Sequence, residues 1–158
     1  MFGFKKKAEP AKKRFQVLAP ANGRLIDLGQ VNDQVFSTRM MGEGFALVPS
    51  DGTITAPVSG TAVSVFPTGH AFGIHTDSGV DVLVHIGLDT VNLQGKGFNV
   101  HVKQGQRVNA GQVMVEFNPE ILKQNNLDPT TMVIFTDGFP SKIQVDAKNV
   151  HRNDPLIG

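Results

Sequence analysis

Two histidines, His70 and His85, stand on either side of a turn and could act together on one small chemical group. Apolar runs flank Asp77-Ser78-Gly79, which predicts a β-hairpin with a two-residue loop at Asp77-Ser78. This register places His70 opposite His85, and side chains in such cross-strand pairs have Cβ atoms roughly 4.5–5.5 Å apart. Two imidazoles at that distance can bind zinc, move a proton or accept a phosphoryl group on nitrogen.

Alternation along this hairpin predicts which face of the sheet carries the histidine pair. Leu83 and His85 fall on the outer face, and the same register sets Phe72 opposite Leu83, beside the histidines. His75 lies at an odd offset from His70, so its side chain is expected on the opposite face and outside the site. The residues expected in the core are Val80, Val82, Val84 and Ile86.

Length and composition favour one globular domain in a reducing compartment. The 158 residues are 40% apolar, contain no cysteine and hold no apolar run long enough to span a membrane, which favours a cytoplasmic location. Residues 1–14 carry six basic residues against one acid and are expected to form a flexible leader with at most weak membrane contact. The single domain at 15–158 then has a net charge of −4 and no basic stripe, which argues against nucleic-acid binding.

Short apolar runs separated by Gly, Pro, Asn and Asp predict an all-β fold, a flattened antiparallel β-barrel or sandwich with little helix. One helix is expected at Asn118–Asn125, with Pro119 in its first turn. Residues 19–23, Ala-Pro-Ala-Asn-Gly, resemble residues 56–60, Ala-Pro-Val-Ser-Gly, as either two similar turns or a duplicated β motif. Strands are expected at Arg14–Ala19, Gly23–Asp27, Gly44–Pro49, Thr53–Ala56, Gly60–Val65, Ala71–Thr76, Val80–Ile86, Asn99–His101, Gln112–Phe117, Met132–Phe135 and Ser141–Val145.

Three kinds of chemistry compete for the histidine pair. A catalytic zinc site usually has three protein ligands, and the third candidates His101, His75 and Asp81 are each poorly placed on the predicted strands. No G-x-S-x-G element is present for a hydrolase. Phosphorylation of one histidine fits an open apolar face, because a second imidazole can donate a hydrogen bond to the transferred group. Thr68 could orient His70 through its hydroxyl.

Residues 79–90, G-V-D-V-L-V-H-I-G-L-D-T, resemble the phosphorylation-site motif of the glucose-type enzyme IIA domains of the bacterial sugar phosphotransferase system. The resemblance runs from about Leu18 to Gly138. It includes both A-P-x-x-G segments, G-E-G at 42–44, T-x-H-A-F at 68–72, L-x-G-x-G-F at 93–98 and the hairpin that begins with G-Q-R-V at 105–108.

This resemblance implies a small β domain that relays phosphate between proteins. It implies that His85 is phosphorylated on Nε2, that His70 supports the transferred group and that Thr68 orients His70. The implied donor is the histidine-phosphorylated carrier HPr, and the implied acceptor is the cysteine of a glucose-type IIB domain in a IIBC sugar permease. The docking surface would comprise Asp33, Val35, Phe36, Phe66, Phe72, Leu83 and Asp89.

The resemblance implies no cofactor for the relay, although zinc can bridge such a histidine pair when a partner supplies a further ligand. Two other classes compete with it. A lysostaphin-like zinc peptidase shares the G-x-x-V-x-x-G-Q hairpin but needs an H-x-H ligand pair that is missing here. A biotinyl or lipoyl carrier needs a lysine at a hairpin tip, which is also missing.

Overall fold

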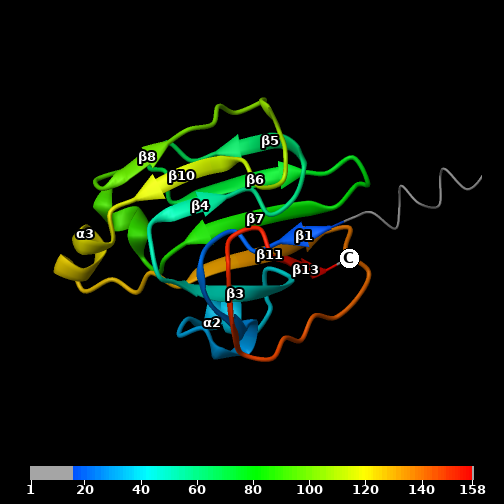
Figure 1. Cartoon of the computed structure of the whole chain (residues 1–158), viewed down its shortest axis with the longest axis horizontal. Coiled ribbons are helices and arrows are strands. Elements are labelled where there is room, and N and C mark those ends of the chain that lie inside the picture. The colour runs from blue at the N-terminus through cyan, green and yellow to red at the C-terminus, as the bar shows by residue number, and fades with distance from the viewer. Residues whose placement is uncertain (1–15, 158) are drawn as a thin grey trace, which may run out of the picture.

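The computed structural model describes residues 16–157, so the leader expected at residues 1–14 lies outside the described part of the chain. Antiparallel strands dominate this part, and the largest sheet has the strand order β12-β2-β3-β11-β7-β6-β5-β9 (Figure 1). Its strands are β2 (Gly23–Asp27), β3 (Glu43–Pro49), β5 (Gly60–Val65), β6 (Ala71–His75), β7 (Asp81–Ile86), β9 (Arg107–Val108), β11 (Thr131–Asp137) and β12 (Lys148–Val150).

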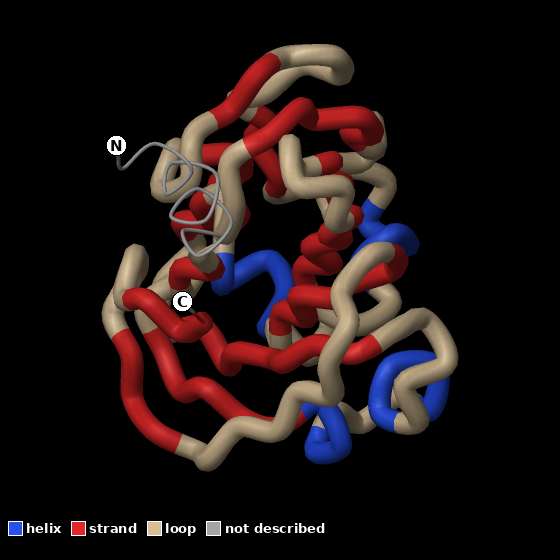
Figure 2. The backbone as a smooth tube through the Cα atoms, turned by 90° about the vertical axis from the view of Figure 1, so that its right-hand side faces the viewer, coloured by secondary structure: helices blue, strands red, loops and turns tan. Residues whose placement is uncertain are grey.

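Two smaller sheets complete the all-β fold expected from the sequence. One has the order β4-β10-β8, with β4 (Thr53–Thr55), β10 (Val113–Phe117) and β8 (Phe98–Val100). The other pairs β1 (Val17–Leu18) with β13 (Pro155–Ile157). The strands run around the middle of the molecule (Figure 2), and residues from all three sheets form one large buried apolar cluster. Because β12 and β9 end the large sheet without pairing with each other, the fold is a sandwich and not a closed barrel.

A second, smaller apolar cluster lies on the outer face of the large sheet. Two short helices cover this face, η2 (Leu28–Gln30) and α2 (Gln34–Ser37). Phe36 of α2 packs there against Met132 and Ile134 of β11. Two more helices are η3 (Thr90–Leu93) and α3 (Pro119–Gln124), the second within the helix predicted at Asn118–Asn125. The outer cluster anchors α2 beside the end of β7 where His85 lies.

The similarity between residues 19–23 and 56–60 reflects a duplicated β motif, because each segment makes the same contact with the other. Leu18 donates its backbone N–H to the carbonyl of Pro57 at 2.9 Å, and Thr55 donates to the carbonyl of Pro20 at 2.8 Å. Leu18 and Thr55 are the residues that precede the two motifs. The two copies therefore make reciprocal contacts through corresponding residues, as two copies related by approximate two-fold symmetry do.

The duplication extends to the strands that follow each copy. Gly23 pairs with Val150 of β12, and Gly60 pairs with Val108 of β9. The turns after these strands also correspond: Gly111 donates its N–H to the carbonyl of Ala56, and Asn153 donates its N–H to the carbonyl of Ala19, both at 2.8 Å. The predicted hairpin at 105–112 therefore has a counterpart near the C-terminus that the sequence did not reveal.

The strand predicted at Ser141–Val145 is wrong, and β12 lies several residues later. Side chains satisfy the backbone of this segment instead of a neighbouring strand: Ile143 donates its N–H to Glu43, and Val145 donates its N–H to Asp27. Arg39 also donates to the carbonyl of Ile143 at 3.3 Å. A segment whose polar groups are held by carboxylates and a guanidinium has no need of ladder hydrogen bonds.

The predicted register of the β6–β7 hairpin is wrong by one residue. Ala71, and not His70, is the Cα partner of His85, and Phe72 pairs with Val84. The loop holds three residues, because Thr76 donates its N–H to the carbonyl of Val80 at 2.9 Å. A one-residue shift moves side chains to the other face. Phe72 is accordingly 0% exposed in the main core and does not lie beside Leu83 on the outer surface.

Candidate functional site

His85 is carried by β7 on the outer face of the large sheet. The residues of β7 alternate between half-buried and buried, and His85 is among the half-buried ones, as the sequence predicted. Its Nδ1 donates a hydrogen bond to the carbonyl of Gly87 at 2.9 Å. A carbonyl can only accept, so Nδ1 carries a proton, and in a neutral imidazole Nε2 then holds a free lone pair. This nitrogen can act as a nucleophile.

His70 reaches the same place from a bend before β6. Gly69, with φ of 75°, turns the chain here, so His70 does not follow the alternation of the strand. The rings of His70 and His85 meet edge to face with centroids 5.2 Å apart. The predicted proximity is therefore confirmed, although the strand register behind that prediction is wrong. The carbonyl of His70 also accepts from the N–H of Ile86 at 2.7 Å, which locks the two strand ends together.

His70 is 5% exposed and is held from behind by Thr68. The Thr68 Oγ1 and the His70 Nδ1 are hydrogen-bonded at 2.5 Å, the contact expected from the sequence. When the hydroxyl donates to Nδ1, the proton of a neutral ring is on Nε2, which can then donate to a group bound outside. Thr68 and Gly87 thus leave the two imidazoles free to act differently.

Burial keeps both histidines neutral near pH 7. It lowers the pKa of His70 below the ordinary value of about 6.5, and the neighbouring positive charge of a protonated His85 lowers it further. Burial also lowers the pKa of His85, although the Gly87 carbonyl and the carboxylates Asp33 and Asp89 act in the opposite direction. A neutral His85 is the form that can attack an electrophile.

Apolar side chains surround the pair on the outer surface. Phe36 lies with its ring centroid 5.1 Å from that of His85, and Phe66 lies 5.2 Å from His70. Phe66 is 41% exposed and Val35 is 46% exposed, while Leu83 is half-buried. Phe72 has no exposed surface, so its predicted place in a docking surface is wrong.

The two predicted acidic residues flank the site on different elements. Asp33 is the N-cap of α2, where its Oδ1 accepts from the N–H of Val35 at 2.9 Å. Asp89 is exposed and precedes η3 with a left-handed φ of 59°. Both carboxylates favour the protonated form of His85 and give the rim of the apolar surface a negative charge.

His75 stays outside the pair, but the predicted reason is wrong. It pairs with Asp81 and therefore shares the outer face with His85. Its Nδ1 is hydrogen-bonded to the Asp81 carboxylate at 2.5 Å. Four residues along a strand separate this pair from the site, which corresponds to about 13 Å. Distance along the hairpin, and not the opposite face, excludes His75.

Sequence reasoning missed the role of Gly87. Its φ of 77° is left-handed, and a Cβ added here would lie 2.5 Å from the Cγ2 of Thr90 and 3.0 Å from the carbonyl oxygen of Asp128. Only glycine fits this position without strain. The signal was present in the spacing H-x-G, which places a glycine carbonyl two residues after the histidine.

Metal binding within the described residues would require the histidine pair to recruit further ligands. Residues 16–157 contain no group of three or more His, Cys, Asp or Glu residues arranged to hold a metal ion. His70 and His85 could supply two imidazole ligands for zinc, and a tetrahedral site would take the others from outside the described chain. The same residues 16–157 form no helix long and apolar enough to cross a membrane.

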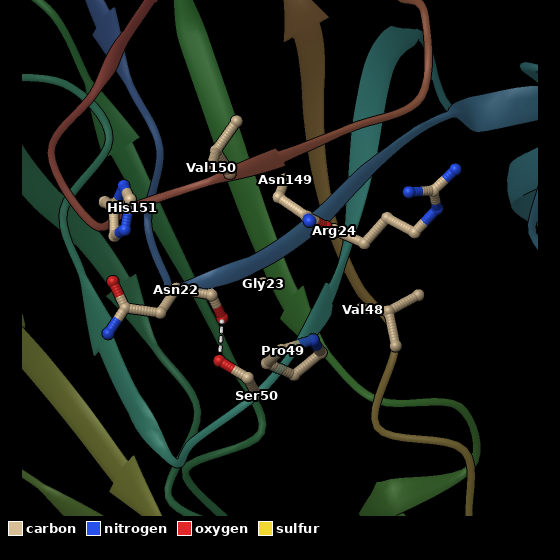
Figure 3. A pocket seen from close by; sticks show the side chains of 9 residues that line it. All are labelled: Asn22, Gly23, Arg24, Val48, Pro49, Ser50, Asn149, Val150 and His151. Carbon is tan, nitrogen blue, oxygen red and sulfur yellow. Dashed lines mark hydrogen bonds between the residues drawn. The ribbon is translucent and has the colours of Figure 1, made fainter.

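A separate surface hollow of about 540 Å³ lies between β2, β3 and β12 (Figure 3). None of the predicted site residues lines it. At the equivalent corner of the other copy of the duplicated motif, Arg107 and Asp77 form a two-pronged ion pair with both N···O distances 2.7 Å. In the strand registers of the two copies, Asn149 and Ser50 of the hollow occupy the places of Arg107 and Asp77. Its lining residues are Asn22, Gly23, Arg24, Val48, Pro49, Ser50, Asn149, Val150 and His151.

Comparison with known proteins gives consistent similarities over most of the chain. The family model described as phosphoenolpyruvate-dependent sugar phosphotransferase system, EIIA 1, matches residues 15–139. The glucose-specific EIIA component of Halalkalibacterium halodurans is 46% identical over 140 residues, 87% of this chain and 81% of that protein. The solved structure of glucose permease IIA from Mycoplasma capricolum is 43% identical, with a TM-score of 0.82, and the match covers 89% of this chain and 92% of that chain.

A longer relative contains the same region as one part of a larger protein. The glucose-specific EIICBA component of Streptococcus pneumoniae is 50% identical over 123 residues. The match covers 78% of this chain but 17% of that protein.

Proposed function

Because the chain belongs to the EIIA 1 family of the phosphoenolpyruvate-dependent sugar phosphotransferase system, we propose that His85 is the residue that carries its phosphoryl group. The chain is a component of a system that couples sugar transport to phosphoryl transfer. The observation that supports His85 most directly is its hydrogen bond to the Gly87 carbonyl, which leaves Nε2 free on an open apolar surface. The family resemblance assigns the same nitrogen.

The proposed first step is the transfer of a phosphoryl group from phospho-HPr. The Nε2 lone pair of His85 attacks phosphorus, the bond between phosphorus and the donor histidine breaks, and its electron pair returns to the donor ring. The proton on Nδ1 stays in the hydrogen bond to the Gly87 carbonyl throughout. In the second step the thiolate of a IIB cysteine attacks phosphorus, and His85 leaves as a neutral imidazole.

His70 is proposed to stabilise the phosphoryl group in transit. Charge spreads over the equatorial oxygens of the transferred group, and a hydrogen-bond donor already in place lowers the barrier. His70 lies beside His85 with little exposed surface, and the hydroxyl of Thr68 can fix its Nδ1 as an acceptor. In this state the His70 Nε2 proton is available to the phosphoryl oxygens.

The surface around the pair is proposed as the docking site for both partners. Val35, Phe66 and Leu83 offer apolar area to a partner. Phe36 is buried in the outer cluster and packs its ring against that of His85. Asp33 and Asp89 give the rim a negative charge, which would attract a partner with basic side chains around its own reactive residue. The printed name of the longer relative, EIICBA, supports a IIB domain as one partner.

The relay needs no cofactor in this proposal, since both partners bring the reactive groups. Zinc would bind the histidine pair only in a complex whose partner completes the ligand set. We propose a cytoplasmic location from the lack of cysteine in the sequence.

Labelling tests the proposed function directly. We expect the protein to take one phosphoryl group when incubated with enzyme I, HPr and labelled phosphoenolpyruvate. His85→Ala should take none, whereas His75→Ala should be labelled as the unchanged protein is, because His75 lies about 13 Å away along the hairpin. Label that survives in His85→Ala would refute the assignment.

A further inference from the structure

The peptide that fixes the tautomer of His85 lies in a turn with little support of its own. Gly87 and Asp89 both have left-handed backbone conformations, with φ of 77° and 59°. Thr90 donates its hydroxyl to the carbonyl of Ile86 at 2.5 Å, which closes the turn but leaves the peptide between Gly87 and Leu88 to be held from elsewhere. The carbonyl of that peptide accepts the hydrogen bond from the Nδ1–H of His85.

A second segment, residues 128–130 between α3 and β11, holds this peptide in place. Leu88 donates its N–H to the carbonyl of Asp128 at 2.9 Å, and Gly87 donates its N–H to the carbonyl of Thr130 at 3.0 Å. A peptide group is planar and trans, so the N–H of Leu88 and the carbonyl of Gly87 point in opposite directions within one rigid planar group. The bond from Leu88 to Asp128 therefore aims the Gly87 carbonyl at His85.

The side chain of Asp128 fixes the direction of its own carbonyl. Its Oδ1 accepts from the N–H of Thr130 at 2.9 Å and from the hydroxyl of Thr130 at 2.6 Å. This is an Asx turn closed around Pro129, and it holds three residues in one conformation. Asp128 is exposed, and Thr130 is 6% exposed. The carboxylate thus orders a segment without entering the core.

We propose that Asp128 is a positioning residue for His85, which it influences through the Gly87–Leu88 peptide. Its carboxylate closes the Asx turn, the turn aims the Asp128 carbonyl at Leu88, and the Gly87 carbonyl then keeps the His85 proton on Nδ1. Without the carboxylate, the Gly87–Leu88 peptide can rotate away from His85. Part of the His85 population then carries its proton on Nε2, and this proton blocks the attack of Nε2 on phosphorus. The proposal rests on the role of His85 proposed above.

Asp128→Ala and Asp128→Asn form the test pair, because asparagine keeps the Oδ1 acceptor and alanine does not. Full-length protein labelled with ¹⁵N in its histidine rings reports the His85 tautomer by long-range ¹H–¹⁵N correlation at pH 7.5. We expect a single Nδ1–H form in the unchanged protein and in Asp128→Asn, and a mixture in which the Nε2–H form predominates in Asp128→Ala. Phosphoryl acceptance from phospho-HPr should fall about tenfold in Asp128→Ala and return to within about twofold in Asp128→Asn.

Thr130→Val supplies a second variant, since it removes the hydroxyl bond and keeps the N–H bond. It should lie between the unchanged protein and Asp128→Ala in both measurements. A single Nδ1–H tautomer in Asp128→Ala, or a loss in Asp128→Asn as large as in Asp128→Ala, would overturn the proposal. The tautomer readout does not require phosphoryl transfer, so it separates failure of this inference from failure of the proposed function, which His85→Ala labelling tests.

Discussion

At the scale of single residues, the two imidazoles of the site differ in what holds their Nδ1 atoms. His85 donates from Nδ1 to a carbonyl, whereas His70 shares its Nδ1 with the hydroxyl of Thr68. The first arrangement leaves an acceptor nitrogen free, and the second allows a donor nitrogen to be free. A nucleophile and a hydrogen-bond donor side by side are what transfer of a phosphoryl group needs.

The pH dependence of phosphoryl acceptance should reflect the lowered pKa of His85. Burial lowers this pKa below about 6.5, so the neutral form predominates at pH 7 and the rate should fall only as the pH drops through the lowered value. Asp89 acts to raise the same pKa. Asp89→Asn should therefore move the acid limb of the pH–rate profile to lower pH. A shift to higher pH would contradict the assigned electrostatics.

Replacement of His70 should separate the two transfers. His70→Gln supplies a side-chain amide of similar length but removes the imidazole that Thr68 orients. We expect the variant still to accept phosphate from phospho-HPr, while transfer to a IIB cysteine falls by about 10² to 10³, as for loss of one preorganised donor. Rapid-quench measurement of each half-reaction checks this. Onward transfer at the unchanged rate would exclude a supporting role for His70.

The sequence predicted the identity and proximity of these residues but not the details of their placement. The motifs singled out His70, His85 and Thr68, and the structure brings all three together. The hairpin register could not be read from the sequence, because two-residue and three-residue loops both fit Asp77-Ser78-Gly79. That single ambiguity placed Phe72 on the wrong face.

At the scale of elements, the turn after β7 decides how His85 is presented. Gly87 combines a left-handed backbone with close neighbours on the side where a Cβ would lie. Gly79 has a similar φ of 88° but nothing within 4 Å of that position. The two glycines therefore separate backbone strain from steric collision.

Gly87→Ala and Gly79→Ala make a matched pair for stability. Gly79→Ala should cost about 1–2 kcal/mol of unfolding free energy from the left-handed backbone alone. Gly87→Ala adds contact with Thr90 and with the Asp128 carbonyl, so it should cost about 3 kcal/mol or more and should also slow phosphoryl acceptance. Urea unfolding of both variants measures the difference. Equal losses would mean that the neighbours of Gly87 move aside freely.

Helix α2 shows why some functional elements escaped sequence reasoning. It is a single turn, Gln34–Ser37, too short for apolar periodicity to be visible. Asp33 caps it, and Arg39 beyond its end forms ion pairs with Asp27 and Glu43, each at 3.1 Å. Tertiary contacts, rather than helix propensity, thus place Val35 and Phe36 beside the histidines.

At the scale of the whole molecule, duplication of a β motif builds a sandwich on which one outer face carries the site. The repeated A-P-x-x-G segments pointed to this architecture, and their reciprocal hydrogen bonds confirm the duplication. The partner strands β9 and β12 show no sequence similarity that could be read in advance, because a two- or three-residue edge strand needs few specific side chains. The fold class was therefore predictable, and the strands after β11 were not.

The location of the docking surface can be tested with two exposed valines on different parts of the molecule. Val35 is 46% exposed beside the site, and Val113 is 39% exposed on β10 of the three-stranded sheet. Val35→Glu should raise the KM for phospho-HPr about tenfold or more, because it buries a charge against an apolar and acidic rim. Val113→Glu should leave KM unchanged. Equal effects of the two substitutions would place docking elsewhere.

The identity of the phosphorylated nitrogen tests the central claim most directly. Protein labelled with ¹⁵N in its histidine rings would be phosphorylated through phospho-HPr, and the ¹⁵N–³¹P coupling would identify the bonded ring nitrogen. The hydrogen bond from the His85 Nδ1 to Gly87 predicts a bond from phosphorus to Nε2 of His85. Phosphorus bonded to Nδ1 of His85, or to any nitrogen of His70, would contradict the account.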